Sequence, residues 1–264
     1  MNETIGYISS ALIGVSLGLI GGGGSILTVP VMVYLFHLSP LTATSYSLFI
    51  VGSTSFIGAI ANYRRNQVHL PTALLFGAAS VVTVFAVRKF IIPIIPLEIA
   101  KIGSFEIHFS FLTMIVFSLL MLLAAISMIG NKVVRKKAEH STVRMLLYGI
   151  GIGLVTGFLG AGGGFLLIPA LVLLIGLEMK KAVGTSLLII AVNSLVGFVG
   201  DAGHYSIDWS FLLLITAIAI TGIFIGGLVS RYVNSSHLKK SFGWFVLVMA
   251  IYILVKEITG QSFG

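Results

Sequence analysis

Two short glycine clusters interrupt long apolar stretches of the sequence, at residues 21–25 (GGGGS) and 160–164 (GAGGG). At each cluster we expect one helix to end, the chain to turn, and a second helix to begin. The first N–H groups of a helix have no partners within it, and the helix dipole adds partial positive charge there. Glycine also lets a ligand approach the backbone closely. The clusters therefore predict an anion site built from backbone N–H groups, lined by Gly22, Gly23, Gly24, Ser25, Gly162, Gly163 and Gly164.

Close helix packing is the alternative explanation for these clusters, because small residues let membrane helices approach each other. The occurrence of two similar clusters, each opening a helix, favours a role in lining a site. A nucleotide site is not indicated. The GAGGG segment lacks the preceding strand and the spacing of G-x-G-x-x-G, and it has no P-loop lysine.

Hydroxyl side chains follow each cluster, in ATSYSL (43–48) and AVGTSL (182–187). They could donate hydrogen bonds to an oxyanion, or they could bond back to the carbonyls of their own helix. Both interpretations stay open for each hydroxyl taken singly. The candidate ligands in this group, with an amide two helical turns further on, are Thr44, Ser45, Ser47, Thr185, Ser186 and Asn193.

A polar group just beyond the apolar stretch 182–200 contains Asp201, His204 and Asp208. Asp201 and His204 could relay protons or gate an external mouth, and Asn62 occupies the place of Asp201 in the internal repeat described below. A solvated loop is the plainer alternative, and metal binding is only weakly indicated. We expect no acidic or basic residue in the middle of a span. This expectation argues against a buried carboxylate relay.

The elements that must position these residues are membrane helices. Hydrophobic residues make up 57% of the 264 residues and charged residues only 9%, against roughly 25% charged in soluble domains. We expect an all-α integral membrane protein with apolar segments at residues 5–20, 25–38, 43–62, 70–89, 109–129, 145–160, 164–177, 182–200, 209–229 and 240–257.

The segment pairs on either side of the glycine clusters are shorter than the ~20 residues that a helix needs to span a bilayer. They could be two full spans each, or re-entrant hairpins of half-helices. We favour half-helices, because segments of this length reach only ~21–24 Å at the helical rise.

An internal repeat relates the two halves of the chain. The segment GVSLGLIGGGGSILTVP (14–30) aligns without gaps on GLVTGFLGAGGGFLLIP (153–169), an offset of 139 residues that continues beyond Ser55 and Ser194. We expect membrane repeats at residues 1–130 and 145–264, joined by a basic cytoplasmic linker at 131–144. The first half should start outside and end inside and the second the reverse, giving inverted repeats with a site between them near the midplane.

The basic residues indicate this orientation. With the N-terminus outside, the inner loops hold twelve of the 16 Lys and Arg residues and the outer loops hold Arg88, Lys89, Lys101 and Lys256. A bias of this kind sets topology. We therefore expect an inner-membrane protein with both termini extracytoplasmic. The net charge of +8 is explained by these loops, so no nucleic acid partner is expected.

The motifs GFLGAGGGFLLIP and AVGTSL, echoed in the first half, resemble the sulfite exporter TauE/SafE family over about residues 5–257. The resemblance implies a small membrane transporter of sulfur-containing anions such as sulfite or sulfonates. The first half has GGGGS for GAGGG and TSYS for VGTS, which leaves open whether both halves contribute equally to the site.

The functional hypothesis is a secondary transporter, acting as an exporter, that binds a small sulfur anion between the Gly24–Ser25 and Gly163–Gly164 helix starts and works by alternating access. An anion channel, or an importer of another small organic anion, is the alternative. A membrane enzyme would need a catalytic pair or a metal cluster, and the sequence indicates neither. Absent cysteine excludes thiolate sites. We expect no cofactor and no bound metal, and the sequence does not indicate an oligomeric state.

Overall fold

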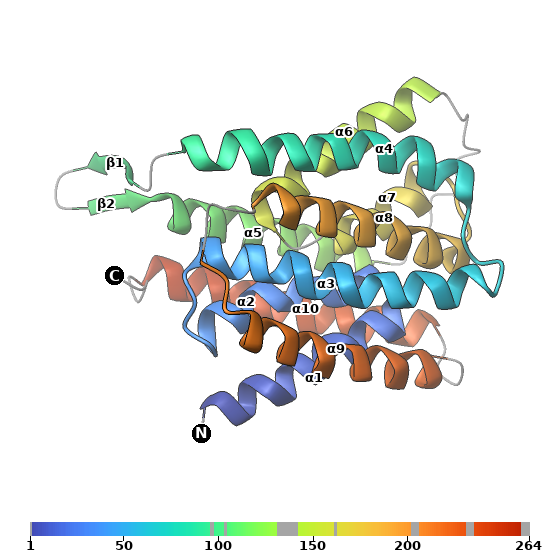
Figure 1. The fold of residues 1–264 in the computed structure, drawn as a ribbon, viewed down its shortest axis with the longest axis horizontal. Helices are drawn as coiled ribbons and strands as arrows, with labels where there is room; N and C mark the ends of the chain where they lie inside the picture. The colour runs from blue at the N-terminus through green and yellow to red at the C-terminus, as the bar shows by residue number, and fades with distance from the viewer. Residues whose placement is uncertain are drawn as a thin grey trace.

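The computed structural model describes residues 2–95, 98–102, 105–130, 142–160, 163–201, 206–230 and 235–259. Over these residues the chain forms ten α-helices (Figure 1). They are α1 (Asn2–Ile20), α2 (Thr28–Tyr34), α3 (Pro40–Tyr63), α4 (Leu70–Ala86), α5 (Phe109–Ile129), α6 (Thr142–Leu159), α7 (Gly164–Leu173), α8 (Met179–Gly200), α9 (Trp209–Val229) and α10 (Ser235–Ile258).

Three shorter helical pieces extend these helices. A 3₁₀-helix, η1 (Gly22–Leu27), leads into α2, while a π-helix, η2 (Val87–Ile91), and a 3₁₀-helix, η3 (Ile92–Ile94), continue α4. Most predicted segments are found as helices with small boundary shifts. For example, α3 begins at Pro40 rather than at residue 43, because Ser39 caps it by accepting a hydrogen bond from the Thr42 N–H at 3.3 Å.

The expected helical membrane fold is confirmed, with one departure in the part of the chain that is described. Strands β1 (Glu98–Ile102) and β2 (Phe105–His108) pair antiparallel in a small hairpin between α4 and α5. From the sequence, this stretch was expected to be a loop. The FEIH segment alternates apolar and polar residues, which fits the two-residue period of a strand.

Helices α3 and α8 form the centre of the molecule. In their apolar stretches 72% and 67% of the residues are buried, against 39% or less in α4, α6 and α9. The two helices run antiparallel, since Leu195 fills the space beside Gly52 while Leu187 fills the space beside Gly58. Their exposed neighbours form an outer layer around this central pair (Figure 1).

The outer helices pack in a reciprocal pattern. Helix α1 packs along α9, and α6 packs along α4. Along these contacts Gly14 lies on the carbonyl of Ala219, and Gly153 lies on the carbonyl of Ser80. Gly14 and Gly153 occupy equivalent places at the 139-residue offset, as do Ser80 and Ala219. Each half therefore supplies one helix to the outer surface of the other.

The α1–α2 pair forms a hairpin. Its open end is held by Tyr7 and Phe36, whose ring centroids lie 5.8 Å apart. From Tyr7 to the glycine cluster the first leg is about 20 Å long at the helical rise, shorter than a ~30 Å hydrocarbon core. At the tip, a Cβ placed on Gly22 would lie 2.5 Å from the Cα of Gly164. The tip of this hairpin therefore meets the tip of the α6–α7 hairpin inside the protein.

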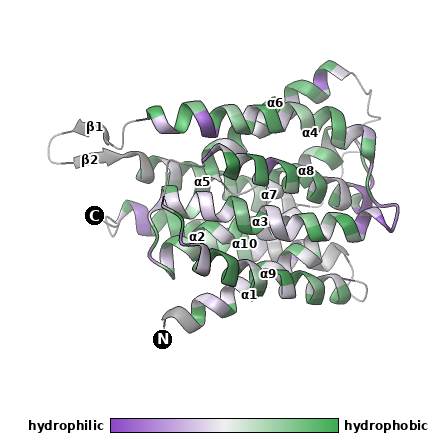
Figure 2. Ribbon diagram, viewed as in Figure 1, coloured by the Kyte–Doolittle hydropathy of each residue, from purple (hydrophilic) through white to green (hydrophobic). Residues whose placement is uncertain are grey.

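The surface has the composition of a protein that faces lipid. Large apolar side chains are exposed on the outer helices, for example Leu74 (69%), Leu123 (63%) and Val248 (62%). The helices are green over most of their length in Figure 2, and hydrophilic residues gather in connections such as the α3–α4 turn. By length and composition five helical stretches could each cross a bilayer: Pro40–Tyr63, Leu70–Ile94, Thr142–Leu159, Met179–Gly200 and Trp209–Val229.

The expected domain division stays a prediction. Residues 131–141, which make up most of the basic linker 131–144, lie outside the described residues.

Candidate functional site at the hairpin tips

The start of α7 has the geometry expected of a helix that opens at a glycine. Gly163 precedes α7 in the left-handed region, with φ 64° and ψ 6°, which only glycine adopts without strain. Its carbonyl accepts from the N–H groups of Leu166 and Leu167 at 3.1 and 3.0 Å. A Cβ on Gly163 would collide with the Thr156 hydroxyl. That hydroxyl is buried and has no hydrogen-bond partner among the described residues.

The first hairpin tip differs from the second. The chain after Gly21 continues as the 3₁₀-helix η1, which contains Gly22, Gly23, Gly24 and Ser25, and regular α-helix begins only at Thr28. The Ser25 hydroxyl donates to the Gly22 carbonyl at 2.7 Å, and Gly24 packs against the backbone of α1 near Ile13 and Leu17. The two helix starts predicted from the sequence are therefore unequal in form.

The tips are joined through backbone. Gly164, the first residue of α7, lies against Gly22, and a side chain on either residue would overlap the other. The two clusters were expected to face each other between the repeats, and Gly22 and Gly164 do approach one another. Gly162 lies outside the described residues.

Three of the predicted hydroxyl ligands are engaged by protein atoms. The Thr44 and Ser186 hydroxyls each donate at 2.8 Å to carbonyls of their own helices, Leu41 and Val183. The Thr185 hydroxyl accepts from the His69 N–H at 2.9 Å. These three hydroxyls therefore keep spare lone pairs, but their most direct hydrogen bonds are structural.

The other two predicted hydroxyls lie buried without protein partners. The Ser45 and Ser47 side chains are 1% and 0% exposed, and neither hydroxyl has a hydrogen-bond partner in the described part of the chain. Buried polar groups are nearly always satisfied by protein, water or ligand. Ser47 lies three residues after Thr44, on the same face of α3.

Asn193 is buried in the central helix α8 and bonded to the neighbouring helix. Its Nδ2 donates to the Ser80 hydroxyl of α4 at 2.6 Å, and its Oδ1 has no partner among the described residues. Asn193 was predicted from the sequence, but Ser80 was not, because Ser80 lies within the apolar stretch of α4 with no motif around it. The repeat offset offers no signal for it, since its equivalent is Ala219.

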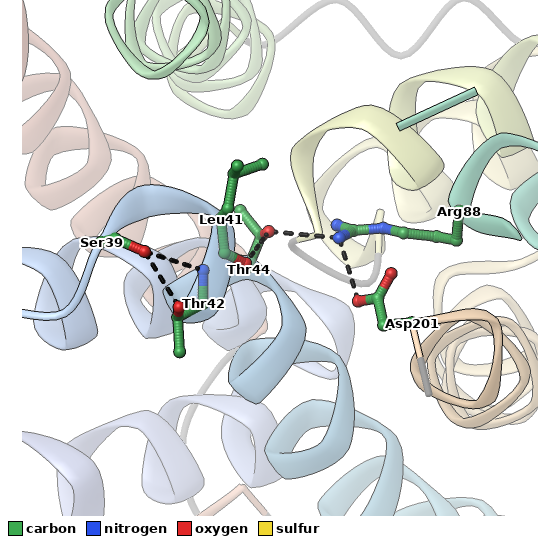
Figure 3. A network of polar contacts seen from close by, with 6 residues as sticks. All are labelled: Ser39, Leu41, Thr42, Thr44, Arg88 and Asp201. Atoms are coloured by element: carbon green, nitrogen blue, oxygen red, sulfur yellow. Dashed lines mark hydrogen bonds and ion pairs between the residues drawn. The ribbon is translucent and has the colours of Figure 1, made fainter. Parts of the chain in front are cut away.

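A buried ion pair lies beside the second hairpin tip (Figure 3). The Arg88 Nη1 is 3.2 Å from the Asp201 Oδ2 and 3.2 Å from the Thr44 hydroxyl oxygen. The Arg88 and Asp201 side chains are 0% and 2% exposed. The expectation that Arg88 belongs to an external loop was wrong. The pair does not contradict the expectation that no acidic or basic residue lies in the middle of a span, because Arg88 lies toward the end of its helical stretch and Asp201 caps the end of α8. Arg88 lies within the helical stretch Leu70–Ile94, and its charge is matched inside the protein.

Glycines make room for this arginine. A Cβ on Gly160 would collide with the Arg88 Nη2 and the Thr44 side chain, and a Cβ on Gly200 would lie 3.0 Å from the Arg88 Cβ. Arg88 itself lies in the π-helix η2. Single turns of π-helix are frequent at functional sites. The Arg88 guanidinium lies between Thr44 of α3, Asp201 at the end of α8 and Gly160 at the α6–α7 tip.

The remaining gate candidates have different surroundings. His204 lies outside the described residues. Asn62 is partly buried and donates to the Gly58 carbonyl of its own helix at 2.8 Å, so it has no ion pair like that of Asp201. Asp208 caps α9 by accepting from the Phe211 N–H at 3.0 Å, and its own N–H donates to the Tyr46 hydroxyl at 2.6 Å.

A second buried acidic residue lies in the last turn of α10. Glu257 is 6% exposed and accepts from the Tyr34 hydroxyl at 3.0 Å. The Lys256 Nζ lies 4.1 Å from the centroid of the Tyr34 ring. These contacts tie the end of the first hairpin to α10, away from the glycine tips.

Comparison with known proteins identifies relatives along nearly the whole chain. The family model described as "Sulfite exporter TauE/SafE" matches residues 7–253. A "Probable membrane transporter protein" of Xylella fastidiosa is 31% identical over 260 residues, 95% of this chain and 94% of the relative. "Probable membrane transporter protein YdhB" of Bacillus subtilis is 25% identical over 231 residues, 87% of this chain and 91% of the relative. No solved structure matches the chain.

Proposed function

Because this chain belongs to the sulfite exporter TauE/SafE family and is a multi-pass membrane transporter, we propose that it carries a small sulfur-containing anion of the sulfite or organosulfonate class out of the cell. The substrate class and the direction rest on the description of the family. The protein would lie in the inner membrane with both termini outside, as the distribution of Lys and Arg predicts.

The observation that carries the proposal is the start of α7. A regular helix of ten residues begins there behind Gly163, with the buried Thr156 hydroxyl beside it. Helix N–H groups at such a start attract an anion, and a hydroxyl adds a donor. The sequence hypothesis gave an equal share to the Gly24–Ser25 start, but the first turn there is 3₁₀ and Ser25 donates to Gly22. We therefore place the larger share of the anion's contacts at Gly163 and Gly164.

The packing of the two halves supports alternating access. Antiparallel α3 and α8, together with the reciprocal α1–α9 and α6–α4 contacts, are the arrangement that inverted repeats would require. Secondary transporters of this type bind substrate between repeats and rock one against the other. The Gly22–Gly164 contact would be where the hairpin tips separate or slide as the site changes sides.

The test is anion-dependent thermal stabilisation of the detergent-purified protein with sulfite, thiosulfate, sulfate, sulfoacetate, taurine and acetate. A ligand of the folded state stabilises it by about 2.7 kcal/mol when present at ~100 times its Kd. We expect a selective shift with a sulfur anion. We also expect that shift to be lost in Gly163→Leu, which alters the start of α7. It should be reduced in Ser186→Ala, because Ser186 lies one turn of α8 before Ile190, whose side chain lies beside Gly22 at the hairpin tips.

The control for Gly163→Leu is Gly151→Leu, since a side chain on Gly151 would meet no atom within 4 Å. The control variant should insert, bind and transport in proteoliposomes like the wild type, whereas Gly163→Leu should insert but not transport. Normal transport by Gly163→Leu would reject the site. Stabilisation by a cation or neutral solute, with no response to any sulfur anion, would reject the substrate class.

A further inference from the structure

We infer that Arg88 binds the charge of the transported anion and that Asp201 is its resting partner, which the incoming anion displaces while Asp201 takes up a proton. This inference rests on the proposed function, and it adds the residue that holds the anion and the ion that is coupled to it. The geometry of the glycine clusters by itself requires neither an arginine that holds the anion nor a coupled proton.

Burying Arg88 and Asp201 costs free energy, which favours a functional role for the pair. Removing two charges from water is expensive, and a buried ion pair is on balance weak evidence of stabilisation. Ionisable groups within membrane helices therefore indicate function by default. Here the Arg88 Nη1 divides its hydrogen bonds between Asp201 and Thr44 at 3.2 Å each. The distance to Asp201 exceeds the 2.7–2.9 Å typical of strong N⁺–H···O⁻ contacts, and an oxygen of a sulfite or sulfonate has the same sign of charge as the carboxylate that it would replace.

The position of the Arg88 guanidinium also favours anion binding. The guanidinium lies against Gly160, at the same tip that carries Gly163 and the start of α7. Ser47, on the Thr44 face of α3, supplies a buried hydroxyl without a partner among the described residues. The Thr156 hydroxyl is a second such group at this tip. A sulfonate or sulfite oxygen held by Arg88 would thus have neutral donors close by.

The ion pair has no counterpart at the equivalent positions of the other half. The repeat equivalents of Arg88, Asp201 and Thr44 are Gly227, Asn62 and Val183. The glycines that follow α1 and α6 are nevertheless alike, because Gly21 and Gly160 both have positive φ, 76° and 65°, and lie against the equivalent residues Val183 and Thr44. A pair needed only to hold the tips together would be expected twice. The single pair marks one tip as the charged one.

The proton follows from charge balance. In the resting state Arg88⁺ faces Asp201⁻. When an anion takes the place of the carboxylate on Arg88, Asp201 would remain as a buried charge at the C-terminal end of α8, where the helix dipole is negative. Taking one proton from solution neutralises it, so one anion and one proton bind together. Release of the anion returns the carboxylate to Arg88 and the proton to solution.

In the described part of the chain, Asp201 is the titratable group that pairs with Arg88. Arg88 faces it from η2, and Thr44 and the Gly160 backbone are uncharged. Lys89, next along η2, and Asp208, at the start of α9, are exposed. His204 lies outside the described residues, and the Asp201 variants below test it by comparison.

The experiment uses sulfite, with sulfoacetate as a second probe, in the thermal stabilisation assay on wild type, Arg88→Gln, Arg88→Lys, Asp201→Asn and Lys89→Gln. Arg88→Gln should weaken binding by about 10- to 100-fold, the effect of losing a charged hydrogen bond. Arg88→Lys should bind more tightly than Arg88→Gln. Lys89→Gln removes a neighbouring exposed charge and should bind like wild type.

Asp201→Asn separates the proton from the anion. In wild type, the affinity for the anion should fall about tenfold per pH unit as pH rises. This holds over the pH range in which Asp201 is ionised in the free protein and protonated in the complex. Asp201→Asn cannot exchange that proton, so its affinity should lack this fall and exceed that of wild type at high pH. The titration of sulfite itself is common to both proteins and cancels in the comparison. A His204-based coupling would leave the wild-type slope in Asp201→Asn, which would overturn the assignment to Asp201.

Equal affinity of wild type and Arg88→Gln would overturn the inference while leaving the proposed function intact. Loss of binding in folded Asp201→Asn, equal to that in Arg88→Gln, would show that the pair only holds the fold. Absence of any response to sulfur anions in wild type would reject the proposed function. If the single Arg88 variants do not fold, two other measurements test the inference. The pH comparison of wild type with Asp201→Asn tests the proton, and anion binding by the double variant Arg88→Gln/Asp201→Asn, which should be weaker than in Asp201→Asn, tests Arg88.

Discussion

Gly22 and Gly164 lie backbone against backbone, with the Cα of Gly164 only 2.5 Å from the place that a Cβ on Gly22 would occupy. These residues belong to different halves of the chain and to the tips of two different hairpins. Their contact closes the space between the two glycine clusters in this conformation. Any movement that opens a path through the centre must therefore change this contact.

Gly22→Ala should destabilise the protein by about 1–3 kcal/mol, the usual cost of overpacking a close contact. The measurement is the thermal unfolding midpoint in detergent. Gly227→Ala is the matched control, because a Cβ there would meet no atom within 4 Å, and it should change stability by about 0.5 kcal/mol or less. Equal midpoints for the two variants would mean that the hairpin tips are not packed as described.

Ser80 and Asn193 should show energetic coupling across α4 and α8. Ser80→Ala leaves the buried Asn193 amide without its partner at 2.6 Å, at a cost of about 1–3 kcal/mol. The double variant Ser80→Ala/Asn193→Leu should be less destabilised than the sum of its single variants, which a double-mutant cycle measures. Thr221→Ala, which removes an exposed hydroxyl bonded only to its own helix, is the control. Additive effects would contradict the hydrogen bond.

The helices could be predicted from the sequence because the bilayer demands long apolar stretches. Segments 109–129 and 209–229 coincide with α5 and α9. Arg88 could not be placed in the same way. It lies near the end of a predicted span, where a charge usually faces water, and its partner Asp201 is 113 residues away in the chain. Only the fold brings these two side chains together.

The candidate site was partly predictable for a similar reason. Glycine clusters indicate where helices break, and the repeat indicates that the two breaks occupy equivalent positions in the two halves. The contact of Gly22 with Gly164 therefore agrees with a pattern in the sequence. Whether a hydroxyl points to its own carbonyl, as Ser186 does, or lies without a protein partner, as Ser47 does, depends on rotamers and neighbours. The sequence contains no direct record of either.

Gly160→Ala should cost more than the strain of its backbone alone. A non-glycine residue at positive φ costs about 1–2 kcal/mol, and Gly176→Ala, at φ 77° on the surface, should show that cost alone. At Gly160 a methyl group would also displace Arg88 and Thr44. We therefore expect a larger fall in thermal stability and a loss of sulfite-induced stabilisation. Binding that is unchanged in Gly160→Ala, relative to Gly176→Ala, would contradict a role of this tip in holding the anion.

The inverted repeat can be tested because the sequence contains no cysteine. Ser39 and Glu178 are repeat equivalents, each preceding a central helix with nearly the same backbone angles, φ −58° and ψ 145° against φ −60° and ψ 144°. Both residues are exposed. Inverted topology places Ser39 outside and Glu178 inside, although their local structures are alike.

Single-cysteine variants Ser39→Cys and Glu178→Cys should therefore react differently with a membrane-impermeant maleimide. In intact cells Ser39→Cys should be labelled and Glu178→Cys should be protected, and permeabilising the cells should make both reactive. The cysteine-free wild type gives the background. Labelling of Glu178→Cys alone would reverse the orientation but keep the inversion. Labelling of both from outside would reject inverted repeats, because equivalent positions in parallel repeats face the same side of the membrane.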